Sequence, residues 1–356
     1  MPSFEGGGVE KNIILIANYF IKKNPSISII TSSKYIKKRF NNKINFISPI
    51  SNLWNKCGRI PKYLICIFLL FKEYNKDKNF KVFCFQGNII RIIFCKLFRL
   101  KIAIRPNSSP TGWSNNLFKK ILFSKILSWS SLIIVNSLKF QKEIKNKFNL
   151  SSVCIYNPLN IREIKTLSKR KIKFKFFSNN CINLISVGRL VDQKDHITLL
   201  KAINYIKNKL KIKLLIVGEG DQKLNLLSYI RENNLEKIVK IKDRVENPFP
   251  YIAKSEIMIL SSKFEGLPNI LLEALALKKF IISSDCPTGP SEILNLGKGG
   301  FLFKVGSFKD LAQKILIYKK QKKKCEKIKK FALKRIDRFD LNKNLLKYYN
   351  PFNSLQ

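Results

Sequence analysis

The pattern that most constrains the fold is an alternation of short apolar runs with helical segments across residues 182–319. The runs at 182–187 and 214–217 are largely apolar and each is followed by a glycine, which is typical of strands buried on both faces. Apolar residues at helical spacing come next, at 197–210 and 222–233. This alternation predicts an α/β fold, in which helices cover both faces of a parallel sheet. The further strands expected in this half are 239–241, 257–260 and 280–283, and the further helices are 269–277 and 308–319.

The first half of the chain repeats the alternation less regularly, so we expect two α/β domains, each a Rossmann-like parallel sheet. A segment rich in Lys, Phe, Ser and Asn is the expected linker between them. The elements expected in the first half are a helix at 13–20 and strands at 28–31, 82–85, 100–104 and 132–136. The expected division is a first domain at 1–167, the linker at 168–180, a second domain at 181–320 and a C-terminal helical tail at 321–356.

The start of the chain departs from this pattern. Residues 1–8 are expected to form a glycine-rich loop that enters the first helix directly. A βα unit would place a strand before that helix. Either this strand lies upstream of Met1, which is the interpretation we favour, or the sheet lacks it.

The charge of the chain is extreme, with 68 Lys and Arg against 23 Asp and Glu, a formal net charge of +45. Such a charge attracts nucleic acid, an anionic membrane surface or a phosphate-bearing substrate. Lys, Ile, Asn and Phe are abundant throughout, as an AT-rich genome would produce without selection for a basic surface. Because the lysines are dispersed and no nucleic-acid-binding motif is present, we expect no nucleic-acid partner.

The cysteines and the apolar runs indicate a reducing cytoplasm. None of the eight cysteines forms a C-x-x-C pair, so neither a zinc site nor a disulfide framework is expected. We find no signal peptide, and the most apolar run, 63–71, is far short of the ~20 residues that span a bilayer. Residues 89–104 and 117–135 mix apolar and basic side chains. They could lie on a membrane surface or form buried elements with basic outer faces.

Residues 263–277 carry the first candidate site. Pro268 suits the first turn of a helix, and Glu273 is the only charge in the apolar run that follows. A buried carboxylate costs several kcal/mol unless it is paired or hydrogen-bonded, and a ligand diol could satisfy it. Glu265 lies in the loop before the helix, whose N-terminus favours phosphate. The structural alternative is that Glu273 pairs with a basic residue and Glu265 is a solvated loop charge.

Residues 186–196 carry the second candidate site. Gly188 follows a predicted buried strand, so Arg189 lies at the carboxyl end of that strand, where ligands of open α/β sheets bind. Lys194 is five residues further on, and two cations beside a crevice can neutralise a diphosphate. The alternative is that Arg189 and Lys194 are ordinary surface cations of a lysine-rich protein.

Other loops offer weaker signals. Residues 217–221 (Val-Gly-Glu-Gly-Asp) predict a tight turn between strand and helix near the nucleotide. Residues 285–292 are expected to form another ligand-facing loop after a strand, and 105–110 occupy the matching place in the first half. The glycines at 6–8 could let backbone approach phosphate, or could be a flexible loop. His196, the only histidine, is expected at a helix start. No metal-binding signature is present, so no metal site is predicted.

These motifs resemble glycosyltransferase family 4, the retaining enzymes of the GT-B fold. Residues 264–269 (Phe-Glu-Gly-Leu-Pro-Asn), with Glu265 and Glu273, look like the paired-glutamate motif of the family. Val187-Gly188-Arg189 with Lys194 is similar to its diphosphate-binding segment. The resemblance covers nearly the whole chain and is strongest at 182–303; the other similar segments are 283–290, 155–158 and 6–10.

The resemblance implies two Rossmann-like domains that face a cleft, with the acceptor on the first and the nucleotide-sugar on the second. It implies that Glu273 binds the donor ribose, that Glu265 faces the donor sugar, and that Arg189 and Lys194 stabilise the leaving diphosphate. It also implies retention without a metal, and no cofactor besides a UDP- or GDP-linked co-substrate. The remaining donor-binding residues expected from it are Gly7, Gly8, Gly188, Gly266, Leu267, Pro268 and Asn269.

One departure from the family affects the acceptor side, because the first domain has no histidine near the expected site of the reacting sugar. The acceptor we expect is a glycan or a lipid-linked saccharide, handled by a cytoplasmic enzyme that could sit peripherally on the inner membrane face. Two alternatives remain: a basic nucleic-acid-binding protein and a nucleotide-sugar binder without catalysis.

Overall fold

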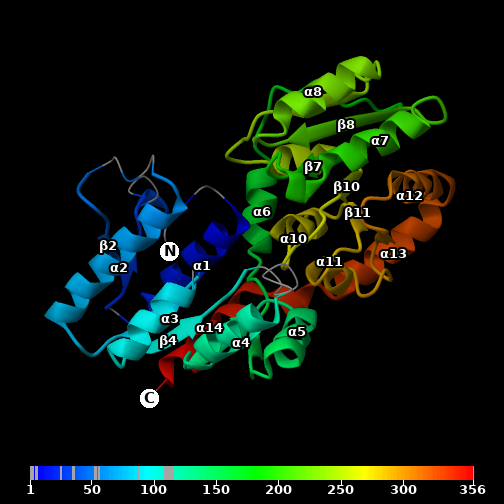
Figure 1. Cartoon of the computed structure of the whole chain (residues 1–356). Helices are drawn as coiled ribbons and strands as arrows, with labels where there is room; N and C mark the ends of the chain where they lie inside the picture. The colour runs from blue at the N-terminus through cyan, green and yellow to red at the C-terminus, as the bar shows by residue number, and fades with distance from the viewer. Residues whose placement is uncertain are drawn as a thin grey trace. The chain divides into compact units, whose positions relative to one another are not determined.

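The protein divides into two compact α/β units (Figure 1). The first unit comprises Met1–Pro158 together with Leu341–Gln356, and the second comprises Leu159–Asp340. Each unit contains a parallel sheet, so the predicted α/β fold class is confirmed. The computed structural model describes residues 4, 7–24, 26–33, 37–51, 54, 57–85, 88–107 and 116–355.

The second unit, described in full, is built on a six-stranded sheet in the order β12-β11-β10-β7-β8-β9, with every neighbouring pair parallel. All four residues of β10 and the first five of β7 are buried, as expected for strands covered on both faces. The strands are β7 (Ile182–Val187), β8 (Ile212–Val217), β9 (Val239–Lys242), β10 (Ile257–Leu260), β11 (Phe280–Ser284) and β12 (Phe301–Phe303).

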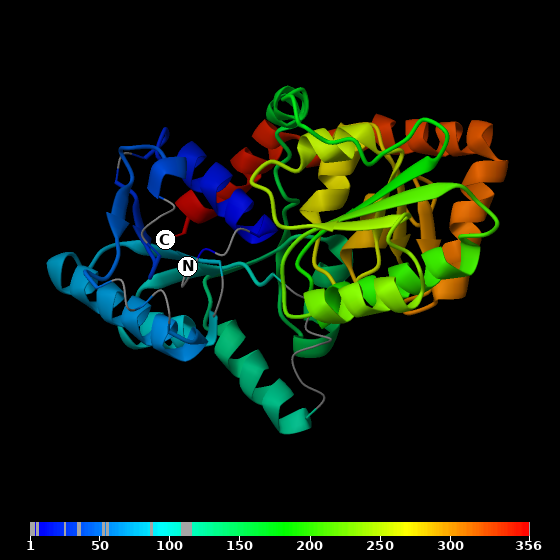
Figure 2. The same ribbon diagram turned by 90° about the horizontal axis from the view of Figure 1, so that it is seen from above.

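Helices cover both faces of this sheet (Figure 2). Its core is made of branched aliphatic side chains, among them Leu184, Leu199, Leu214, Ile259 and Ile315, none of which is exposed. The helices of the unit are α6 (Ile161–Ser168), α7 (His196–Ile206), α8 (Lys223–Glu232), α9 (Phe249–Lys254), α10 (Asn269–Ala276), α11 (Gly289–Ile293), α12 (Phe308–Lys320) and α13 (Lys322–Lys334), with short 3-10 helices at Asp192–Lys194 and Ile336–Phe339.

In the described part of the first unit, four parallel strands form one sheet in the order β3-β4-β5-β6, and β1 and β2 form a separate parallel pair. The strands are β1 (Ser28–Ile30), β2 (Asn45–Ile47), β3 (Lys81–Cys84), β4 (Lys101–Ile104), β5 (Leu132–Val135) and β6 (Val153–Cys154). The helices are α1 (Gly8–Phe20), α2 (Arg59–Lys76), α3 (Asn88–Leu97), α4 (Leu117–Ser128), α5 (Leu138–Phe148) and α14 (Leu341–Asn353), with a 3-10 turn at Lys37–Arg39.

The two faces of this sheet bury two separate apolar clusters. Ile134 joins the cluster that contains α1 and α14, whereas its neighbours Ile133 and Val135 join the cluster that contains residues of α2 to α5. Alternation along a strand sends successive side chains to opposite faces, which explains this division. Helices α2 to α5 therefore share one layer of the unit.

The unit boundaries differ from the division expected from the sequence. Helix α6, which the prediction gave to the first domain, packs against α9 and α10 and belongs to the second unit. Residues 169–180 form no helix or strand, but the ring of Phe174 lies 5.1 Å from that of Tyr251, so this segment packs on the second unit.

The expected C-terminal tail is also not a separate part of the chain. Helix α13 packs against α10, α12 and β11 of the second unit, and α14 packs against α1 of the first. The side chain of Tyr348 on α14 accepts a hydrogen bond from Arg105 Nε at 2.9 Å and donates one to the Ile155 carbonyl. These buried contacts fix the last helix on the first unit.

The described residues that precede α1 are Phe4 and Gly7, and neither lies in a strand. Among the described residues, no helix combines the length and the apolar character that crossing a bilayer requires.

Candidate functional site

The strand order of the second unit reverses direction between β7 and β10. From β7 the chain adds β8 and β9 on one side and then returns to add β10, β11 and β12 on the other. In open α/β sheets, ligands bind outside the carboxyl ends of the strands at such a reversal. Arg189 and Lys194 follow β7, whereas Glu265 and α10 follow β10. The two candidate sites predicted from the sequence therefore meet at one edge of one sheet.

Lys194 and Glu265 contact each other directly at this edge. The Lys194 Nζ lies 2.5 Å from Glu265 Oε1, and the two side chains are only 16% and 10% exposed. The hydroxyl of Ser262 donates to the same carboxylate oxygen at 2.7 Å. An ammonium group has three N–H donors, so this contact leaves Lys194 the capacity to hold a second anion.

Further hydrogen bonds fasten the loop after β7 to the loop after β10. The backbone N–H of Lys263 donates to the Gln193 carbonyl at 2.8 Å, and Gln193 Nε2 donates to the Phe264 carbonyl at 2.9 Å. The Ser261 hydroxyl donates to the Lys194 carbonyl at 2.8 Å. The loop that carries Lys194 is thus positioned by the loop that carries Glu265.

Arg189 lies on the exposed side of this arrangement. Its Nη2 is 3.4 Å from Gln193 Oε1, whereas the contacts of Glu265 are with Lys194 and Ser262. The structure therefore brings Lys194 and Glu265 together, and places Arg189 beside them on the same loop.

Glu273 lies inside α10 and is 5% exposed, as the isolated charge in an apolar run predicted. Pro268 stands immediately before the helix, with Asn269 as its first residue, so the proline falls one residue earlier than expected. Gly266 and Leu267 are buried in the turn that leads into it. The first N–H groups of a helix have no partner within the helix and carry positive partial charge, which suits an anion.

Thr288 and Gly289, which lie in the predicted loop at 285–292, support this turn. Thr288 is buried, and its hydroxyl donates to the Glu265 carbonyl at 2.7 Å and lies 3.1 Å from the Gly266 carbonyl. A Cβ on Gly289 would lie 1.9 Å from the Gly266 carbonyl oxygen, so only glycine fits there. The loop after β11 is therefore a support for the loop that carries Glu265. Its Thr-Gly-Pro sequence after a buried strand was the available signal.

The turn after β8 is tight, as predicted. A Cβ on Gly218 would lie 1.8 Å from the Gly188 carbonyl oxygen, so a larger residue would separate the turns after β7 and β8. The backbone N–H of Leu190 donates to the Glu219 carbonyl at 2.7 Å. Gly188 itself lies beneath the aliphatic part of the Lys194 side chain.

His196 is the first residue of α7, the helix start that the sequence predicted. Its side chain is buried next to Lys194, and burial first, then the charge of Lys194, lower its pKa to about 4. A neutral imidazole near pH 7 follows from this shift.

The predicted donor-binding glycines Gly7 and Gly8 lie in the first unit, at the cap and the first position of α1. Arg105 follows β4 and is fully buried, and it donates to Asn157 Oδ1 and Tyr348 Oη. The two serines and the proline at 108–110 fall outside the described residues.

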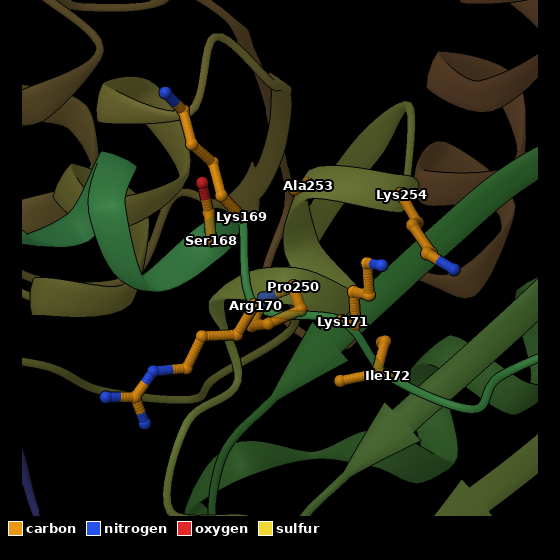
Figure 3. A pocket seen from close by; sticks show the side chains of 8 residues that line it. All are labelled: Ser168, Lys169, Arg170, Lys171, Ile172, Pro250, Ala253 and Lys254. Carbon is orange, nitrogen blue, oxygen red and sulfur yellow. The ribbon is translucent and has the colours of Figure 1, made fainter.

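A hollow of about 460 Å³ lies elsewhere on the second unit (Figure 3). It is lined by residues 168–172 and by Pro250, Ala253 and Lys254 of α9, and none of the predicted donor residues lines it. The side chains of Lys169, Arg170 and Lys254 point in different directions rather than toward one centre. The candidate site is therefore the edge at β7 and β10 rather than this hollow.

The described residues contain no group of three or more His, Cys, Asp and Glu side chains placed to hold a metal ion.

Comparison with known proteins identifies the family. Residues 168–335 match the family described as "Glycosyl transferases group 1". The amylovoran biosynthesis glycosyltransferase AmsD of Erwinia amylovora is 36% identical over 244 residues, which cover 66% of this chain and 68% of that protein.

A second relative is the N-acetylgalactosamine-N,N'-diacetylbacillosaminyl-diphospho-undecaprenol 4-alpha-N-acetylgalactosaminyltransferase of Campylobacter jejuni. It is 32% identical over 242 residues, which cover 66% of this chain and 64% of that enzyme. An uncharacterised glycosyltransferase of Methanocaldococcus jannaschii is matched over 53% of its length. The matches with these two proteins thus span less than two thirds of either one.

Solved structures show the same fold. Anabaena HepE in complex with UDP superposes with a TM-score of 0.79 at 17% identity, covering 99% of this chain and 98% of that one. The lipopolysaccharide outer core galactosyltransferase WaaB superposes with a TM-score of 0.72 at 18% identity, covering 99% and 97%. The matched segment and the relatives agree, and the chain belongs to the family of glycosyl transferases group 1.

Proposed function

We propose that this protein transfers a sugar from a nucleotide-sugar donor to a glycan or lipid-linked saccharide acceptor, with retention of configuration and without a divalent metal. The observation that carries the proposal is the Lys194–Glu265 ion pair at the β7–β10 edge, beside the helix that holds buried Glu273. A cation, a carboxylate and a helix N-terminus at one sheet edge suit a diphosphate-linked sugar.

The leaving diphosphate is the group that this edge would stabilise. Negative charge grows on it as the bond to the sugar breaks, and fixed cations there lower the barrier most. Lys194 keeps two N–H donors for it besides the one that holds Glu265. Arg189, exposed on the same loop, supplies a second cation, and the N-terminus of α10 adds backbone donors.

The nucleoside is placed by Glu273 in this proposal, through hydrogen bonds from the two ribose hydroxyls to its carboxylate. Glu265 faces the sugar, oriented by Lys194 and Ser262. We favour a uridine diphosphate donor over a guanosine one, because the structural neighbour HepE was solved with UDP and UDP-glucose.

The acceptor is inferred from the relatives alone. AmsD is named for amylovoran biosynthesis, and the Campylobacter enzyme for a saccharide on diphospho-undecaprenol. A polymer precursor or lipid-linked saccharide is therefore the acceptor class we propose for this chain. Such an acceptor would place the protein in the cytoplasm, peripherally on the inner face of the membrane.

The test is transfer of labelled sugar from a panel of UDP- and GDP-sugars into a lipid-extractable acceptor, with EDTA present. We expect one donor to support transfer, the product to keep the anomeric configuration of the donor, and Lys194→Met to lower the rate 100-fold or more. Transfer that requires added metal, or an inverted product, would overturn those parts of the proposal. Donor binding without turnover would identify a binding protein instead.

A further inference from the structure

The outer side of α2 carries a stripe of apolar side chains that are largely exposed. Ile60, Leu64, Phe68 and Phe71 are 71%, 58%, 51% and 39% exposed. They recur every three or four residues and so lie on one face of the helix. The opposite face, with Cys66 and Leu70, is buried.

Two further helices of the same layer, α3 and α4, also carry exposed apolar side chains. On α3, the side chains of Ile90, Ile93 and Leu97 are exposed at helical spacing, and on α4 those of Ile121 and Leu122 are exposed. Packing joins the three helices, since α3 contacts α4 and the Phe71 ring of α2 lies 5.7 Å from that of Phe98, just after α3. Soluble proteins rarely expose so many large apolar side chains together without a partner.

The charged residues in this part of the chain are almost all basic. Residues 59–128, which contain all three helices, carry fourteen Lys and Arg but only Glu73 and Asp77 as acids. Lys72, Lys96, Lys119 and Lys125 are exposed on the same three helices, and the ammonium of Lys72 lies 4.8 Å from the centre of the Phe68 ring. Apolar side chains surrounded by cations match an anionic bilayer surface.

We propose that the apolar surface formed by α2, α3 and α4 is a docking surface for an anionic lipid bilayer. The apolar side chains enter the interface between headgroups and acyl chains, and the surrounding lysines contact anionic headgroups. A second copy of the chain fits the surface poorly, because it would bring the same dense positive charge against it. Nucleic acid needs the cations but gains nothing from aliphatic side chains.

The inference rests on the proposed function at one point: a lipid-linked acceptor is the reason that this protein would bind a membrane. It places the bilayer contact on the first unit, on helices that carry none of the donor-site residues. Vesicle binding and nucleotide binding can therefore fail independently of each other.

The test compares two double variants that keep the net charge constant. Leu64→Ser/Phe68→Ser removes the centre of the stripe, and Leu224→Ser/Leu346→Ser removes two similarly exposed leucines on α8 and α14. Each purified protein is sedimented with phosphatidylcholine vesicles containing phosphatidylglycerol, at about 0.15 M and about 1 M salt, where the screening length falls from about 8 to 3 Å. Thermal melting and UDP binding are measured on each protein as checks of folding and of the donor site.

We expect the wild-type protein and the control variant to bind anionic vesicles equally. The stripe variant should bind at least tenfold more weakly, which corresponds to about 1.4 kcal/mol, and the difference should persist at high salt. Unchanged UDP binding in the stripe variant would show that the donor site is intact.

Three results would overturn the proposal. The first is equal vesicle binding by both variants, which would mean adsorption through charge alone. The second is no binding of the wild-type protein to anionic vesicles. The third is a dimer in sedimentation velocity that the stripe variant converts to a monomer, which would assign the surface to self-association.

A second measurement reports insertion directly. Phe68→Trp should shift its fluorescence emission to shorter wavelength on anionic vesicles, whereas Leu224→Trp should not. An unshifted Phe68→Trp in vesicle-bound protein would contradict the proposal.

Discussion

Lys194 and Glu265 lie on loops that follow different strands, and an ion pair of 2.5 Å joins their side chains. The sequence analysis predicted separately that Lys194 and Glu265 act on the donor. In the structure the two side chains contact each other directly. The pair holds Glu265 in place before any donor arrives, and it places the ammonium of Lys194 at the edge where a diphosphate would bind. Stability and catalysis are therefore coupled at this pair, and a combination of variants can separate them.

The first prediction concerns Lys194→Met alone and together with Glu265→Gln. The single variant leaves a nearly buried carboxylate without its cation and should lower the free energy of unfolding by about 1–3 kcal/mol. Adding Glu265→Gln removes the stranded charge and should restore most of that loss, while transfer stays at least 100-fold slower than in the wild-type protein. Denaturant melts and initial rates measure the two effects.

The matched control is Lys263→Met, which breaks an ion pair with Asp192 that is well exposed. Exposed pairs contribute little, so this variant should change neither stability nor rate appreciably. If Lys194→Met behaved like Lys263→Met in both assays, the account of the pair would be wrong.

The second prediction concerns Thr288, which is held at φ 76° and ψ −101° by its surroundings. Its hydroxyl supports the carbonyls of Glu265 and Gly266, and Thr288→Val keeps the side-chain shape but removes the donor. Leaving buried carbonyls unpaired should cost about 1–3 kcal/mol of stability, and a displaced Glu265 should lower kcat about tenfold or more. Thr288→Ser, which keeps the hydroxyl, should retain kcat; equal losses in both variants would indicate a packing effect only.

The third prediction concerns the pH dependence of stability through His196. Its folded-state pKa is about 4 and its ordinary value is 6.5, so the unfolded chain binds the proton more readily. Stability should therefore fall as the pH drops from about 7 through 6.5 toward 4, by about 2 kcal/mol between pH 7 and pH 5. In His196→Asn, the free energy of unfolding should fall by about 2 kcal/mol less between pH 7 and pH 5 than in the wild-type protein, as measured by melts at the two pH values. An identical pH profile in the variant would exclude His196 as its source.

The strands of the second unit were predictable because their signals are local. The strands at 182–187 and 257–260 were predicted at their observed limits, since a short apolar run followed by polar or glycine residues defines a buried strand. The burial of Glu273 was predictable because it is the only charge in an apolar helical run.

The first unit was harder to predict, and α2 shows why. Residues 63–71 form a continuous apolar run, and such a run does not distinguish a strand from a helix by periodicity alone. Only the structure shows that one part of the run is buried while Leu64, Phe68 and Phe71 are exposed on the same side of a helix.

Contacts between distant segments were beyond the reach of sequence patterns. The support of Glu265 by Thr288 depends on two loops that meet only after β10 and β11 pair. The return of α14 to the first unit depends on Tyr348 reaching Arg105, 243 residues away in the chain. The Thr-Gly-Pro motif marks the loop after β11, but no local signal says which distant segment Thr288 or Tyr348 contacts.

The most direct test of the donor site is the thermal stability of the protein with UDP, GDP, ADP and TDP in turn, at fixed salt and without metal. A nucleotide at ~100 times its dissociation constant should stabilise the folded state by about 2.7 kcal/mol. The account predicts that UDP raises the melting temperature and that Glu273→Gln removes the shift. No shift with any nucleotide, or an equal shift in Glu273→Gln, would contradict it.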